Sequence, residues 1–158
     1  AKTTWDEAHK KMTTIHYARA VLSAMLIWLL AVVAFVGSYM VPVLQDPDVQ
    51  ANLVLSVAII PAVAVGAYVY YRKPGIETKG FPLGCFFFLV GGSLDAVITV
   101  PVFILPAGGS YLSFYSDPGF WLIGVEFVAM TTLYWYLAVR SRPGYRAVAS
   151  TPLTNAKS

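Results

Sequence analysis

Charged side chains are scarce in this sequence. Lysine, arginine, aspartate and glutamate make up 12% of its 158 residues, whereas a soluble globular domain carries about 25%. Apolar residues account for 58% and stand in long runs that short polar stretches separate. This pattern excludes the surface of an ordinary soluble domain and predicts an integral membrane protein.

Cysteine is nearly absent, and positive charge is limited. The one cysteine, Cys85, lies in an apolar run, so the sequence offers neither a disulfide framework nor a multi-cysteine metal site. We interpret Cys85 as a packing residue rather than a reactive thiol. The formal net charge of +3 is small, and the basic residues stand at the ends of the apolar runs. We therefore expect no nucleic-acid partner, because charges placed in this way mainly set membrane orientation.

Motifs of catalysis are missing too. The sequence shows no nucleophile beside a base, no paired histidine and carboxylate, no phosphate-binding glycine loop and no spacing typical of metal ligands. The loops between the apolar runs are too short to form a catalytic domain. We predict that the protein is not an enzyme and has no metal site and no intrinsic cofactor.

Four apolar segments are long enough to cross a bilayer, which takes about 20 helical residues. Pro61 and Pro101 fall inside the second and third and are expected to kink them, because each removes a backbone hydrogen bond. We predict an all-α fold, an integral membrane four-helix bundle over residues 17–139, followed by a polar tail at 140–158. The spans cover about residues 17–44, 51–71, 81–105 and 118–139.

The segment that precedes the first span, residues 1–16, is typical of a short amphipathic helix at the membrane surface. Thr4 followed by Glu7 matches a capping box. Lysines on its other faces suit an anionic lipid leaflet. Contact with lipid and docking on a partner subunit both remain open. One apolar stripe at helical spacing is formed by Trp5, Ala8, Met12 and Ile15.

Positive charge lies on one side of the predicted membrane. All eleven lysines and arginines stand before or at the start of the first span, between the second and third, or after the fourth. The opposite loops, "QDPDVQ" and "PAGGSYLSFYSDP", hold aspartates and no lysine or arginine. The positive-inside rule therefore predicts that the N and C termini are both cytoplasmic. The second of these loops can cap the bundle or contact a partner.

Two carboxyl groups fall near the middle of predicted spans. Asp95, in "GGSLDAVITVPVF", belongs to the third, and Glu126, in "WLIGVEFVAM", belongs to the fourth. An ionised carboxylate alone at that depth costs about 2.5–3.5 kcal/mol even on lenient scales. Because the two spans are consecutive, the acids can share one site if their faces match. They can be protonated, share a proton, bind a cation, face a donor on another protein, or accept hydrogen bonds from a tyrosine, Ser93, Thr99, Thr131 or Thr132.

Small residues surround Asp95 in the third span. Gly91, Gly92 and Ala96 stand close to it, and Gly84 lies seven residues before Gly91 on the same helix face. Small residues let a neighbouring helix backbone approach. We therefore predict that Asp95 is a polar contact that holds helices together, within this bundle or between it and another.

The two histidines, His9 and His16, lie seven residues apart on one predicted helix face. A haem held by two histidines needs them on facing helices at matching depth, so such a site is not expected. Two interpretations remain. One is a tetrapyrrole contact within a larger complex, and the other is hydrogen bonding to water, lipid headgroups or a partner.

The second half of the chain, beginning "GCFFFLVGGSLDAVITVPVF", resembles a bacterial family of small four-span membrane proteins of uncharacterised function. The likeness rests on "LDAVITVPVF", a short loop with aromatic residues, and a final aromatic-rich span that begins near Trp121. The resemblance implies a multi-pass protein of the bacterial inner membrane and a recurring pattern that includes Asp95. It implies no activity.

Two functions agree with these features. The first is a non-catalytic accessory subunit of a larger membrane complex, of respiratory or photosynthetic type, that binds partners and lipid through its helix faces and polar ends. A pigment, quinone or lipid at the interface with a partner is then the expected ligand. The alternative is a small proton- or cation-coupled transporter that uses Asp95 and Glu126. Small multidrug exporters resemble this chain in size, but their essential glutamate is in the first span, which has no acid here.

Overall fold

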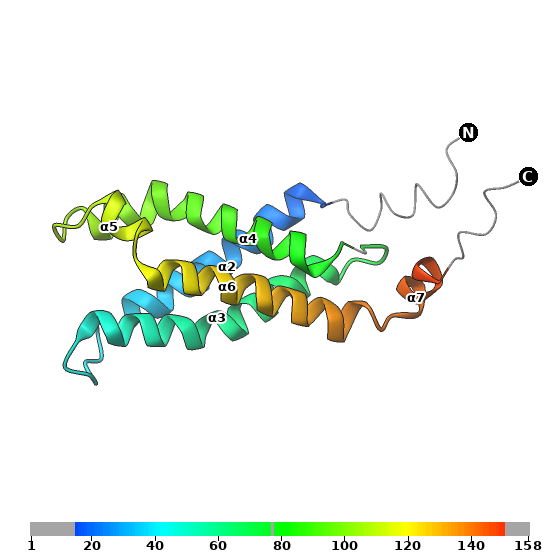
Figure 1. The fold of residues 1–158 in the computed structure, drawn as a ribbon, viewed down its shortest axis with the longest axis horizontal. Helices are drawn as coiled ribbons and strands as arrows, with labels where there is room; N and C mark the ends of the chain where they lie inside the picture. Colours follow the sequence, from blue (N-terminus) through cyan, green and yellow to red (C-terminus); the bar gives the residue numbers. More distant parts are fainter. Residues whose placement is uncertain (1–14, 77, 151–158) are drawn as a thin grey trace, which may run out of the picture.

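The computed structural model describes residues 15–76 and 78–150, and every regular element in these ranges is a helix (Figure 1). The predicted all-α fold is confirmed. The two π-helices, η1 and η2, directly continue α4 and α6. The elements are α2 (Tyr17–Ser38), α3 (Pro47–Tyr71), α4 (Gly80–Leu94), η1 (Asp95–Ile104), α5 (Tyr111–Tyr115), α6 (Pro118–Tyr134), η2 (Trp135–Val139) and α7 (Pro143–Ala149).

Four helices are long and apolar enough to cross a membrane, which confirms this part of the prediction and indicates a multi-pass membrane protein. The spans run over Tyr17–Ser38, Pro47–Tyr71, Gly80–Ile104 and Pro118–Val139. In the bundle α2 packs mainly on α3, and α4 packs mainly on α6, with further contacts between α2 and α4 and between α3 and α6. The core between them holds Ile27, Ile59, Val63, Leu83 and Phe87.

The first span ends at Ser38, earlier than the apolar run that extends to residue 44. The buried side chain of Gln50 explains the difference, because it satisfies the backbone of the loop that follows. Its amide nitrogen donates to the carbonyls of Ser38 and Val41 at 2.6 and 2.8 Å. Its oxygen accepts from the N–H groups of Val43 and Leu44 at 2.7 and 2.8 Å. These bonds replace those that further helix would make.

One end of the bundle carries the positive charge, and we call it the basic end. Arg19 and Arg142 lie here and cap α3, whose last carbonyls have no partner within the helix. Arg19 donates to the Val69 carbonyl at 2.6 Å, and Arg142 donates to the Tyr71 carbonyl at 2.9 Å. The other basic residues of the described ranges lie at helix ends or loops on this side: Arg72, Lys73, Lys79, Arg140 and Arg146.

The opposite end, which we call the acidic end, carries three aspartates and the short helix α5 (Figure 1). Asp46 and Asp117 cap α3 and α6, since their carboxylates accept from backbone N–H groups of the first turns. The third aspartate, Asp48, lies in the first turn of α3.

Two predicted segments are described only in part. The amphipathic helix expected over residues 1–16 and its His9 lie outside the described residues, apart from Ile15 and His16. The tail expected over 140–158 contains α7, which begins at Pro143, and residues 151–158 lie outside the described ranges. The histidine that is described, His16, has an exposed side chain directly before α2.

Candidate functional site

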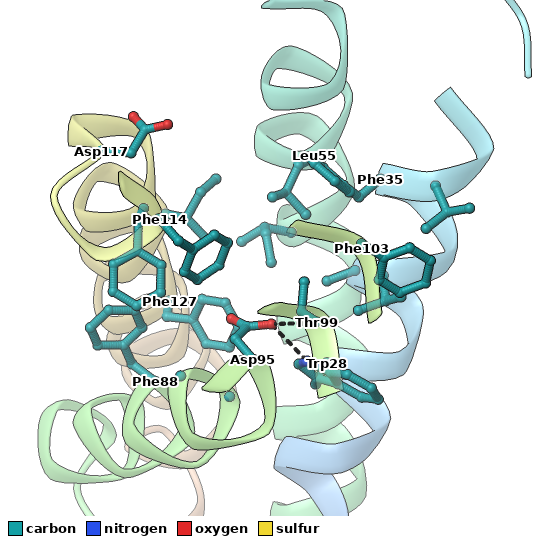
Figure 2. A pocket seen from close by; sticks show the side chains of 18 residues that line it. Trp28, Phe35, Leu55, Phe88, Asp95, Thr99, Phe103, Phe114, Asp117 and Phe127 are labelled. Carbon is teal, nitrogen blue, oxygen red and sulfur yellow. Dashed lines mark hydrogen bonds between the residues drawn. The ribbon is translucent and has the colours of Figure 1, made fainter. Parts of the chain in front are cut away.

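Asp95 joins two helices by hydrogen bonds. Its Oδ1 accepts from the indole Nε1 of Trp28, in α2, at 2.9 Å. The same oxygen accepts from the hydroxyl of Thr99, one turn further along η1, at 2.6 Å. The other carboxyl oxygen points away from both donors (Figure 2). The carboxyl group is therefore fixed on one side and available on the other.

The available oxygen borders a cavity of about 110 Å³ between the four spans. Its lining includes the exposed residues Phe103 and Asp117, so the cavity reaches the surface near the acidic end. Asp95 and Thr99 supply the polar groups deeper inside. Seven of the eighteen lining residues are aromatic, namely Trp28, Phe35, Phe88, Phe103, Phe114, Phe120 and Phe127.

Glu126 does not line this cavity, and its partner comes from another helix. The hydroxyl of Ser56, in α3, donates to Glu126 Oε1. The second oxygen, Oε2, is buried and has no hydrogen-bond partner in the described part of the chain. The two intramembrane acids therefore connect different helix pairs, Asp95 linking η1 to α2 and Glu126 linking α6 to α3, rather than accepting from a common donor.

Three further hydroxyl groups named from the sequence bind the backbone of their own helices. Ser93 is exposed and donates to the Leu89 carbonyl at 2.8 Å. Thr131 and Thr132 each donate at 2.7 Å to the carbonyl four residues earlier, a common arrangement for such residues in helix interiors. The described ranges contain no group of three His, Cys, Asp or Glu side chains placed to hold a metal ion.

The small residues around Asp95 differ in their surroundings. A Cβ on Gly84 would lie 2.8 Å from the Cα of Val128, so α4 and α6 approach closely there. A Cβ on Gly91 would meet no atom within 4 Å, and Gly91 lines the cavity. A Cβ on Gly92 would lie 3.5 Å from the Phe120 ring. The close approach is therefore at Gly84, and open space lies at Gly91.

The helix α5 closes the acidic end over η1. A π-helix pairs each N–H with the carbonyl five residues earlier, and Pro101 has no N–H to pair with Ala96. The hydroxyl of Tyr111 donates to that Ala96 carbonyl at 3.0 Å. Tyr115 donates to the Gly92 carbonyl at 2.7 Å. Burial raises the pKa of Tyr115, and the nearby Asp95 carboxyl adds to the shift, so the hydroxyl keeps its proton.

Two partners of the acids were not assigned from the sequence. Trp28 stands in the middle of the first span, away from the interfaces where tryptophan is usually enriched. This unusual depth is the sequence feature that could have indicated a partner for its indole N–H. Ser56 is the lone hydroxyl residue among the apolar residues of the second span before its tyrosines. Both make hydrogen bonds to carboxyl groups.

Comparison of the chain with known proteins identifies no relative. No family model matches the chain, and no curated protein or solved structure does.

Proposed function

We propose that the chain is a non-catalytic accessory subunit of a larger membrane assembly, such as a respiratory or photosynthetic complex. The observation that carries the proposal is an open apolar groove on the surface of α4 and α6. Small residues at a helix surface let another membrane helix approach closely. Those in the groove are Cys85 and Ala129, and Phe81, Trp121, Gly124, Val125, Val128, Thr132 and Leu133 line it further.

The partners of the acids support this proposal. Asp95 and Glu126 each accept a hydrogen bond from a neighbouring helix of the same bundle. Such contacts hold a bundle together, because membrane helices gain little from apolar attraction alone. A subunit that presents outer faces to partners needs this internal cohesion.

The distribution of charge supports an orientation with both chain ends in the cytoplasm. The described lysines and arginines gather at the basic end, and the positive-inside rule places such an end on the cytoplasmic side. Membrane-impermeant labelling of a cysteine introduced at Ser141, in a Cys85→Ala background, tests this. Labelling in intact cells contradicts the orientation, and labelling only in opened vesicles supports it.

Co-purification tests the subunit role. We expect larger membrane proteins to accompany the tagged chain in stoichiometric amount when native membranes are solubilised in a mild detergent. Ala129→Phe fills the groove and should release these partners. The matched control, Val57→Phe, adds the same ring at a position that is 70% exposed on α3 and outside the groove. Recovery of the chain as a lone oligomer contradicts the proposal.

A small cation- or proton-coupled transporter is the second candidate. One observation favours it, the free carboxyl oxygen of Asp95 beside a cavity that reaches the acidic end. In liposomes that contain a pH-sensitive dye, such a protein would move protons when a substrate gradient is applied. Asp95→Asn would stop this movement without unfolding the bundle.

A further inference from the structure

The cavity beside Asp95 combines acidic side chains with aromatic rings. Its lining contains two carboxyl groups, those of Asp95 and Asp117, and no lysine, arginine or histidine. Both donors to Asp95, Trp28 and Thr99, bind Oδ1 at 2.9 and 2.6 Å. They hold the group so that its second oxygen faces the cavity (Figure 2). A ligand that donates a hydrogen bond to this second oxygen would give both oxygens of the carboxyl group a partner.

The aromatic wall favours an organic cation over a metal ion. Ring faces attract ammonium groups, and aromatic cages are a recurring site for substituted ammonium ligands. Hard metal cations need six or more oxygen ligands. Among the lining residues, only Asp95, Asp117 and Thr99 carry side-chain oxygens, and Asp117 uses one of its own to cap α6.

The volume limits the size of the ligand. An engineered cavity of about 150 Å³ in another protein takes up benzene, and the cavity beside Asp95 measures about 110 Å³. It is smaller than that cavity but open to the surface, so it suits a ligand with at most one ring. The surface opening near Phe103 and Asp117 provides a route of entry at the acidic end.

We propose that this cavity binds a small organic ammonium ion, with the charged nitrogen on the free oxygen of Asp95 and one ring-sized apolar group among the phenylalanines. The inference goes beyond the accessory-subunit role and does not depend on it. A site of this kind can serve a subunit that senses such a cation, or a transporter that carries it.

Binding of two matched probes tests the proposal. Benzylammonium and benzyl alcohol have the same ring, but only the first is charged at neutral pH. With the full chain in lipid nanodiscs, and empty nanodiscs subtracted, calorimetry should show benzylammonium binding at least about tenfold more tightly, a step of about 1.4 kcal/mol. Asp95→Asn should remove this preference, and Glu126→Gln, outside the cavity, should leave it unchanged.

A second pair of variants keeps the test valid if Asp95→Asn fails to fold. Gly91→Val adds a side chain to the cavity, where a Cβ meets no atom within 4 Å, and should weaken binding of both probes. The matched control is Gly37→Val, which also meets no atom within 4 Å and lies outside the cavity lining. Equal binding of both probes, binding of neither, or affinities that Gly91→Val does not change would overturn the proposal.

Discussion

The indole N–H of Trp28 and the carboxyl group of Asp95 form a hydrogen bond of 2.9 Å that joins α2 to η1. It joins residues 67 positions apart in the sequence and is partly buried. The loss of one donor to a partly buried carboxyl group removes the net stability that its hydrogen bond contributes.

Trp28→Phe should lower the free energy of unfolding by about 0.5–1.5 kcal/mol, the net value of one hydrogen bond, because Thr99 still donates to the same oxygen. Trp135→Phe provides the control, since its Nε1 is buried and makes no hydrogen bond in the described part of the chain. Removing that N–H should be neutral or stabilising. Thermal unfolding in detergent, followed by circular dichroism, compares the two variants. Equal losses would show that ring packing, rather than the bond to Asp95, determines the effect of Trp28.

The contact between Ser56 and Glu126 predicts that substitutions of the two residues destabilise the bundle by different amounts. Ser56→Ala should destabilise the bundle by about 1–3 kcal/mol, because both Glu126 oxygens would then be without a partner. Glu126→Gln keeps an acceptor oxygen for the serine and should cost less. Ser93→Ala is the control, because that hydroxyl is exposed and bonds its own helix. A double-mutant cycle of Ser56→Ala with Glu126→Leu, which removes the acceptor, measures the coupling, and a value near zero contradicts a specific contact.

The sequence predicts the spans well because their signal is local. An apolar run of sufficient length specifies a membrane helix whatever its neighbours are, and α3, η1 and η2 end close to the predicted bounds. The end of α2 is different, because it depends on Gln50, a residue of the next helix that bonds the loop backbone. Hydropathy alone carries no information about such a side chain.

The site is only partly predictable for a similar reason. The depths of Asp95 and Glu126 follow from their positions in the spans, but their partners depend on how each helix is rotated about its axis. The structure turns Asp95 toward α2 and Glu126 toward α3. All four spans are apolar around most of their circumference, so periodicity gives little information about rotation. The cavity follows from that rotation and had no signal in the sequence.

Gly84 and Gly91 should respond in opposite ways to alanine. A Cβ on Gly84 would lie 2.8 Å from the Val128 Cα, so α4 and α6 would have to separate. We expect Gly84→Ala to cost about 1–3 kcal/mol of stability. Gly91→Ala meets open space and should stabilise by about 0.5–1 kcal/mol, because alanine is the better helix former. Unfolding of both variants in the same detergent checks this, and similar effects of the two would contradict the close approach at Gly84.

The acidic end should respond to high pH through Tyr39. Its hydroxyl donates to Asp48 at 2.9 Å. Burial, followed by this bond and the negative charges of Asp48 and Asp46, raises the pKa of Tyr39 from 10.0 to about 12. Because the folded state binds the proton more tightly, the stability that Tyr39 contributes is complete below pH 10 and is lost as the pH rises through 12.

Tyrosinate absorbance measures this directly. The difference between the titrations of the parent chain and Tyr39→Phe should show one ionisation with a midpoint near pH 12. Asp48→Asn should move that midpoint down, because it removes a nearby negative charge and weakens the acceptor. The free energy of unfolding of Tyr39→Phe should also fall less between pH 10 and 12 than that of the parent chain, which loses the contribution of the Tyr39 hydroxyl in this range. A difference midpoint at pH 10 would mean that the hydroxyl is neither desolvated nor bound to Asp48 in the folded protein.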